Sequence, residues 1–388
     1  MSQAENLNTQ LTRRSWLVLA ASAVTGCGGG GSVSVAGLPG TGGTGLFAQG
    51  PISGFGSVIL NGIRFDDTAA TVQLDGLAGG SSDLRLGMVA TVQGQRGADA
   101  TLGTASSIEV WSMAQGLVTQ GQATPGASGQ FSVAGMTLLT DPNTVFDGFS
   151  ATAPLSVGQR VAVWGLQAGA DARSWSATRV ALVAASAVVG SGLVTAEDSQ
   201  RTLNGLLLTG PLAGTLAPGA LVRVQGTLSA SGSSLEVASV KPLSGSGGAS
   251  AQSDAEIEGV VTAAPSASGF SLGTIVVDAS QAVYSPANAQ LFIGARVEVN
   301  GTWRSGVLQA TSVALQDEEA PHALEISGSI ETFNSLSNFT VRGQRCDASG
   351  LTSFGHGTAA DLKLGAKVKL QGRMAGEVLR VTELEFSV

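Results

Sequence analysis

One eleven-residue block occurs five times in this chain, and its repetition constrains the fold more than any other feature. The block reads Leu-x-Φ-Gly-x-x-Φ-x-Φ-x-Gly, where Φ is mostly aliphatic. Its copies span residues 84–94, 155–165, 216–226, 291–301 and 362–372. A Gly-x-[Ile/Val] step precedes each copy, at Gly50, Gly116, Gly192, Gly259 and Gly328. These glycines lie 66, 76, 67 and 69 residues apart, so the sequence predicts an array of one repeated module.

Apolar residues follow period two inside each module, as in Phe131-Ser132-Val133 and Phe270-Ser271-Leu272. This alternation is typical of a strand with one buried face. The central Gly of the block is predicted at a turn or bulge, before the next strand. The last strand of a module has a two-residue step in its alternation, as between Ala310 and Val313, where a β-bulge would restore the facing.

Five or six short strands in about 65 residues favour a small β-barrel, closed or partly open, of the oligonucleotide/oligosaccharide-binding (OB) kind. The predicted fold class is therefore all-β: a tandem array of five small OB-like barrel modules, with almost no helix after the N-terminal segment. Two alternatives are a β-sandwich built from paired modules and a β-solenoid, although the period is longer than that of a solenoid rung. The expected organisation is a signal peptide (1–26), a Gly-rich tether (27–48), modules 49–112, 113–184 and 188–242, a flexible linker (243–254), and modules 255–316 and 324–388.

The composition supports folded β-structure and argues against some partners. Hydrophobic residues make up 43% of the chain and charged residues 12%, which excludes charged disorder. The net charge is −8 and Lys and Arg form no cluster beyond the first residues, so nucleic acid is not expected as a partner. Two cysteines provide no disulfide framework.

The N-terminus has the pattern of an export signal. Arg13 and Arg14 precede an apolar run, and small residues lead to Cys27. A helix from Trp16 to Gly26 would rise roughly 16 Å, against about 30 Å of hydrocarbon, so it is too short to span a membrane.

Val24-Thr25-Gly26-Cys27 resembles the bacterial lipobox, which implies that Cys27 carries lipid and becomes the first mature residue. Acyl chains would then hold the protein on a membrane. Arg13 and Arg14 with their neighbours resemble a twin-arginine export signal; the alternative is a general secretory signal. Gly28 stands after the cysteine in place of the Asp associated with inner-membrane retention, so the lipobox resemblance implies the outer membrane, on its periplasmic face or at the cell surface, and not the inner membrane.

An Asp-containing turn precedes the repeated block, and a Leu-x-Ala-x-x-Val run follows it. This pattern resembles a bacterial family of exported repeat domains catalogued as domain of unknown function 5666. The resemblance covers residues 50–388, and the third copy lacks a clear Asp-turn. It implies tandem β-modules in the cell envelope, and it transfers no active-site residue.

Candidate chemical groups are few. His322 and His356 have no neighbour at metal-ligand spacing, so no metal and no cofactor is expected. Ser271 lies in a Gly-x-Ser-x-Gly motif, but a strand is predicted after it where a nucleophile elbow needs a helix. Four carboxylates recur at equivalent places, Asp66, Asp141, Asp278 and Asp347. They are interpreted as turn residues that accept backbone N–H bonds, with repeated cation or sugar ligands as the alternative.

Trp164 and Trp303 are the candidate ligand platform. Trp164 has the opposite phase to Val163, which predicts an outward side chain, whereas the pattern does not show which way Trp303 faces. Packing in a core or between modules is the default interpretation for both indoles, and an exposed ligand platform is the alternative. The functional hypothesis is a non-catalytic cell-envelope lipoprotein that binds or scaffolds an envelope protein. The alternative is a lipoprotein that binds polysaccharide, and a second, weaker alternative is an envelope hydrolase.

Overall fold

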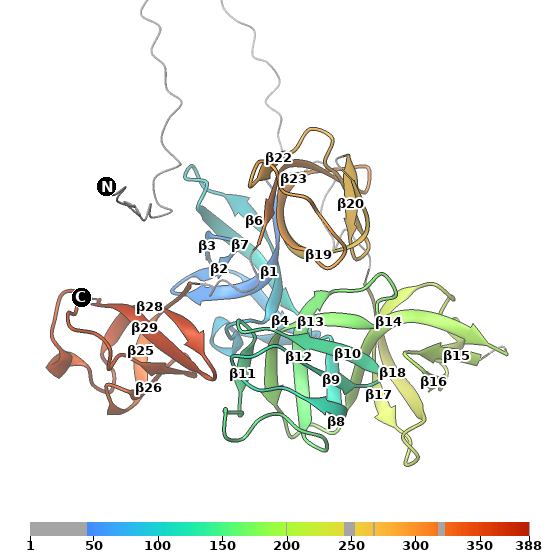
Figure 1. Cartoon of the computed structure of the whole chain (residues 1–388), viewed down its shortest axis with the longest axis horizontal. Helices are drawn as coiled ribbons and strands as arrows, with labels where there is room; N and C mark the ends of the chain where they lie inside the picture. Colours follow the sequence, from blue (N-terminus) through green and yellow to red (C-terminus); the bar gives the residue numbers. More distant parts are fainter. Residues whose placement is uncertain (1–44, 199, 244–252, 267, 317–322, 388) are drawn as a thin grey trace, which may run out of the picture. The chain divides into compact units, whose positions relative to one another are not determined.

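The computed structural model describes residues 45–243, 253–316 and 323–387, apart from residues 199 and 267. Within these ranges the chain forms five small β-barrels in tandem, and the helices are single 3-10 turns (Figure 1). The predicted all-β fold class is confirmed. None of the helices in the described ranges has the length and apolarity that a membrane span requires.

Barrels 1 and 2 come first in the chain. Barrel 1 consists of β1 (Leu46–Phe55), β2 (Val58–Leu60), β3 (Ile63–Asp66), β6 (Val89–Arg96) and β7 (Leu102–Val110), with β4 (Thr71–Leu74), β5 (Leu77–Gly79) and η1 (Ser81–Asp83) between β3 and β6. Barrel 2 consists of β8 (Ala114–Gln122), β9 (Gly129–Val133), β10 (Met136–Thr140), β12 (Arg160–Gln167) and β13 (Ser174–Leu182), with β11 (Val145–Asp147) before β12.

Barrels 3, 4 and 5 repeat the pattern. Barrel 3 consists of β14 (Val188–Glu197), β15 (Gln200–Leu203), β16 (Leu206–Thr209), β17 (Leu221–Leu228) and β18 (Ser234–Pro242), with η2 (Ala213–Thr215) before β17. Barrel 4 consists of β19 (Asp254–Ser266), β20 (Gly269–Leu272), β21 (Ile275–Asp278), β23 (Arg296–Arg304) and β24 (Val307–Leu315), with β22 (Val283–Ser285) before β23. Barrel 5 consists of β25 (Leu324–Ser335), β26 (Asn338–Val341), β27 (Gln344–Asp347), β28 (Lys367–Ala375) and β29 (Val378–Phe386), with η3 (Ala359–Asp361) before β28.

Every barrel closes in the same order. In barrel 1 the antiparallel ladders are β1–β2, β2–β3, β6–β7 and β1–β6, and the parallel pair β3–β7 completes the circle. The other four barrels have the equivalent five ladders, including one parallel pair each. Closure leaves the five main strands without free edges. The order first–second–third–fifth–fourth is that of an OB barrel, so the sandwich and solenoid alternatives are excluded.

The two glycines of the block have separate geometric roles. The central one has positive φ in all five copies, from 76° at Gly87 to 97° at Gly294, and it turns the chain into the fourth strand. The final one lies against the fifth strand, where an added Cβ would come within 2.0 to 2.3 Å of a carbonyl oxygen. Only glycine allows the two backbones to approach this closely.

The predicted bulge in the last strand is present. Gly301 pairs with Ala310 and Asn300 pairs with Ser312, which leaves Thr311 as the extra residue. The Thr311 hydroxyl donates to the carbonyl oxygen of Asn300 at 3.1 Å. Equivalent register shifts occur at the final glycine of the other four blocks, so the bulge belongs to the module.

Strand β1 connects barrels 1, 4 and 5. Leu46–Gln49 pairs in parallel with residues 254–257 of β19, while its other edge pairs with β6. The far end of β1, Gly54 and Phe55, pairs with β25. Phe47 lies in the core of barrel 4, where its ring meets Trp303 edge-on at 6.4 Å. These barrels are thus joined by backbone ladders as well as by side chains.

Candidate functional site at the barrel junction

Both candidate platform indoles are buried, so the alternative of an exposed Trp platform is wrong and packing, the default interpretation, holds. Trp164 does point away from the core of barrel 2, as its phase indicated, but it lies in an apolar cluster with Leu86 and Met88 of barrel 1 and is 8% exposed. Trp303 is 3% exposed within barrel 4. Packing of one barrel on another covers the outward face that the sequence pattern showed for Trp164.

The recurring carboxylates are turn residues, as interpreted from the sequence. Each accepts a backbone N–H bond from the residue two positions later, at 2.7 to 3.1 Å: Asp66 from Thr68, Asp141 from Asn143, Asp278 from Ser280 and Asp347 from Ser349. The backbone N–H and the hydroxyl of Thr68 hold the pKa of Asp66 below its ordinary value. No group of three or more His, Cys, Asp and Glu side chains in the described ranges could hold a metal ion.

The remaining candidates have structural positions. Ser271 lies on β20, and β21 follows it where a nucleophile elbow would need a helix. His356 is an exposed loop residue with φ of 58°. Cys346 is a buried free thiol, and burial raises its pKa to about 12. Arg13, Arg14, Cys27 and His322 lie outside the described residues.

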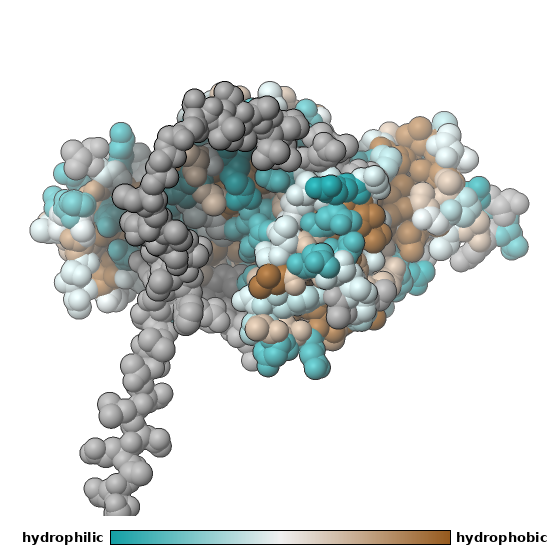
Figure 2. Space-filling view, turned by 90° about the horizontal axis from the view of Figure 1, so that it is seen from above, coloured by the Kyte–Doolittle hydropathy of each residue, from teal (hydrophilic) through white to brown (hydrophobic). Residues whose placement is uncertain are grey.

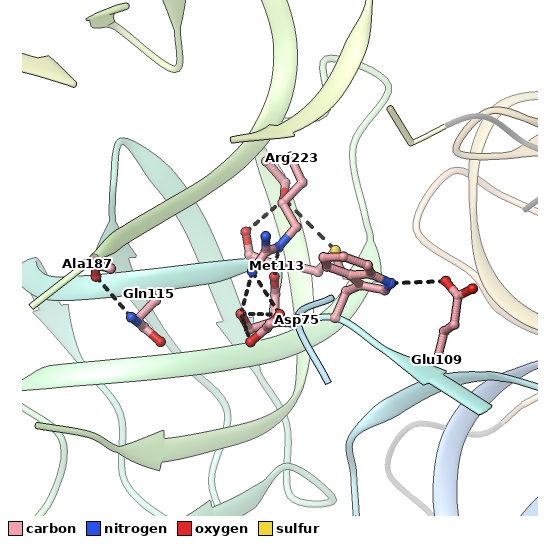
Figure 3. Close-up of polar contacts among 9 residues, drawn as sticks. Asp75, Glu109, Met113, Gln115, Ala187 and Arg223 are labelled. Atoms are coloured by element: carbon pink, nitrogen blue, oxygen red, sulfur yellow. Dashed lines mark hydrogen bonds and ion pairs between the residues drawn. The ribbon is translucent and has the colours of Figure 1, made fainter. Parts of the chain in front are cut away.

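A polar network joins barrels 1, 2 and 3 at the segment between β7 and β8 (Figure 3). Arg223 on β17 donates from Nη2 to Asp75 Oδ1 at 2.7 Å and from Nε to the carbonyl oxygen of Ser112 at 2.6 Å. The Ser112 backbone N–H also donates to Asp75, at 2.8 Å. Asp75 lies at the β4–β5 turn, so one guanidinium connects barrel 3 with the hairpin of barrel 1 and the chain leading into barrel 2.

Burial makes this network sensitive to the loss of any partner. Arg223 is 2% exposed, and desolvation lowers its pKa although Asp75 opposes the shift. The guanidinium carbon lies 5.0 Å from the ring centroid of Trp111. Trp111 in turn donates from Nε1 to Glu109 at 3.2 Å, and Lys241 of barrel 3 pairs with the same carboxylate at 3.2 Å.

A cavity of about 420 Å³ lies beside this network, and we call it the junction cavity. Barrel 1 contributes β1, β6 and β7 with Trp111, barrel 2 contributes β12, barrel 3 the end of β18, and barrel 4 contributes β19 to β21. Its volume falls within the range of small-ligand sites. Val89, Leu166 and Val260, from three barrels, form an apolar cluster in its lining.

One wall of the junction cavity carries a row of polar side chains. Gln49 pairs with Thr91 across β1 and β6, and Thr91 pairs with Glu109 across β6 and β7. Gln93 lies two residues beyond Thr91 on the same face. In the described part of the chain, the side chains of Gln49, Thr91 and Gln93 make no hydrogen bond to protein.

The repeat pattern could not reveal this cavity, because each barrel supplies only part of its wall. A weak signal was present in barrel 1, where Gln49, Thr91 and Gln93 occupy outward positions of β1 and β6. The sequence contains nothing that brings these residues to β19 or β12, which follow much later in the chain.

The family model described as "Domain of unknown function (DUF5666)" matches residues 49–109, 115–181, 258–314 and 327–385. These four stretches cover more than half of the chain. The chain belongs to this family. Barrel 3 lies between the matched stretches of this DUF5666 protein, and it has the same strand order. Its third strand ends in Thr209 and Gly210 follows, whereas the other four barrels have an Asp at the end of this strand or directly after it. No curated protein matches the chain.

Proposed function

We propose that this DUF5666 protein is a non-catalytic cell-envelope lipoprotein whose docked barrels form a scaffold for a protein partner. Cys27 carries the lipid, and the signal around Arg13 and Arg14 directs export. The outer membrane is the proposed location.

One recurring side chain carries the scaffold proposal. The third residue of the block is buried in barrel 1, where Leu86 packs against barrel 2. The equivalent residues Val157, Ile293 and Leu364 are 60, 58 and 68% exposed. Figure 2 shows hydrophobic residues in patches among hydrophilic ones on one face of the molecule. In barrel 1 this apolar side chain joins two barrels, and the same block position is exposed in three other barrels. The exposed copies support the proposal that further protein surfaces dock there.

The barrel 1–barrel 2 contact shows how such a side chain can dock. Around Leu86, the Thr178 hydroxyl donates to the carbonyl oxygen of Gly87 at 2.6 Å, and Arg179 donates to that of Leu86 at 3.1 Å. Arg179 also pairs with Asp147, and burial lowers its pKa to about 10. Leu86 is therefore held against barrel 2 by apolar packing of its side chain and by hydrogen bonds to the backbone carbonyl oxygens of Leu86 and Gly87.

The test is in-cell crosslinking of the tagged lipoprotein, followed by mass spectrometry of what is retained. Ile293→Ser should reduce recovery of a stoichiometric protein partner, whereas Val276→Ser should not. Val276 is a matched control because it is 51% exposed on the same barrel and lies outside the block. Equal recovery with both variants would refute the role of the block residue. Cys27→Ala should abolish labelling by radioactive palmitate, and persistent labelling would refute the anchor.

A further inference from the structure

We propose that the junction cavity binds a short, neutral oligosaccharide. The ligand class is inferred from the cavity itself, and its biological relevance rests on the proposed location in the cell envelope. The site is distinct from the candidate platform at Trp164 and Trp303, because neither indole lines the cavity.

The polar row selects a ligand that can both donate and accept hydrogen bonds. Gln49 and Gln93 each carry an amide oxygen and an amide NH₂ group, and Thr91 carries a hydroxyl. They lie on neighbouring strands β1 and β6, about 4.8 Å apart, and so form a fixed array on the wall of the cavity. A wholly apolar ligand would remove water from these groups and replace none of their hydrogen bonds.

The charges at the cavity argue against an ionic ligand. Lys241 pairs with Glu109 at 3.2 Å, and Glu258 pairs with Arg296 at 2.5 Å. Each charged side chain of the lining thus already has an opposite charge beside it. An anionic or cationic ligand would have to compete with these ion pairs, while a neutral one would not.

The facing walls are aliphatic. Val260, Leu272 and Ile275 of barrel 4 line the cavity together with Leu166 of barrel 2, and all four are less than 9% exposed. A pyranose ring presents C–H groups on its faces and hydroxyls around its rim. An aliphatic surface opposite a row of amides and a hydroxyl suits that combination.

The test uses the full-length lipoprotein in a polyoxyethylene detergent, because sugar-headed detergents would compete. Cellotriose, maltotriose and chitotriose are titrated by calorimetry, with trigalacturonate as the charged comparison. At least one neutral trisaccharide should bind saturably, and Gln93→Ala should weaken that binding about tenfold by removing a hydrogen-bonding group. Gln371→Ala is the matched control, because Gln371 occupies the same block position in barrel 5, outside the cavity.

Absence of saturable binding by all three neutral trisaccharides would overturn the proposal. So would tighter binding of trigalacturonate, or an equal loss of affinity in Gln93→Ala and Gln371→Ala. Gln49→Ala gives a second reading at the other end of the row, and unchanged affinity in both Gln49→Ala and Gln93→Ala would also refute the site. Partner capture through Ile293 is independent of these titrations, so failure of the scaffold proposal is distinguishable from failure of this one.

Discussion

Replacing Arg223 with Ala should uncouple barrel 3 from barrel 1. The substitution removes a guanidinium that is 2% exposed and that makes three hydrogen bonds, two to Ser112 and one to Asp75. Breaking a buried ion pair costs about 3–5 kcal/mol when the remaining charge stays buried. The Asp75 side chain is 31% exposed and keeps hydrogen bonds from Ser112, so we expect about 3 kcal/mol, at the low end of this range.

The assay is urea unfolding followed by tryptophan emission, combined with hydrogen exchange of β17 and β18. Arg223→Ala should lower the unfolding midpoint and increase exchange in barrel 3 before barrel 1 unfolds. Arg380→Ala is the matched control, because its ion pair with Asp347 has the same 2.7 Å distance but its side chain is 63% exposed. The control should lose no more than about 1 kcal/mol. Equal losses in the two variants, or a change below about 0.5 kcal/mol in Arg223→Ala, would refute the reasoning.

Gly372→Ala would place a Cβ 2.3 Å from a carbonyl oxygen of β29 and should lower the free energy of thermal unfolding by about 3 kcal/mol. Gly365→Ala has open space around the new Cβ but a φ of 81°, so it should cost about 1–2 kcal/mol. The reverse order of the two losses would contradict the roles of the two glycines. Cys346, with its pKa raised to about 12 by burial, should resist thiol reagents at pH 8 until the protein unfolds, and rapid native labelling would disprove its burial. Burial, and then two neighbouring carboxylates, raise the pKa of Glu298 from 4.5 to about 7. Between these pH values the folded state binds more protons than the unfolded state, so the free energy of unfolding should fall as the pH rises from 4.5 to about 7. Glu298→Gln should make this fall shallower, and a pH profile of stability that is unchanged in the variant would contradict the raised pKa.

The sequence predicted the architecture of one module well because every module repeats the same local constraints. The spacing of the block glycines and the two-residue step before Val313 correspond to a turn and a bulge that recur in all five barrels. The same local chemistry identified Asp66 and its equivalents as turn residues. The turn, the bulge and the Asp turns depend only on residues nearby in the chain or on the adjacent strand of the same barrel. The period-two pattern of apolar residues contains information on both.

The contacts between barrels could not be predicted in this way. Trp164 was placed on the correct side of its strand, but the pattern does not show that the Leu86 loop of barrel 1 covers it. Gln49 and Ile257 are 208 residues apart in sequence and are adjacent in the β1–β19 ladder. Side-chain periodicity identifies the buried face of a strand, but it contains no information on which distant element buries the other face.

The central claim is that the barrels are joined through shared ladders, and a disulfide between β1 and β19 tests it most directly. Gln49 and Ile257 are partners in this parallel ladder, at a spacing suited to a disulfide. In a Cys346→Ser background, Gln49→Cys with Ile257→Cys should oxidise to one crosslinked species, identified by mass spectrometry of the joined peptides. Gln49→Cys with Val276→Cys is the control and should retain free thiols. Free thiols in the first pair, in folded protein, would contradict the claim and indicate barrels that are not docked through β1.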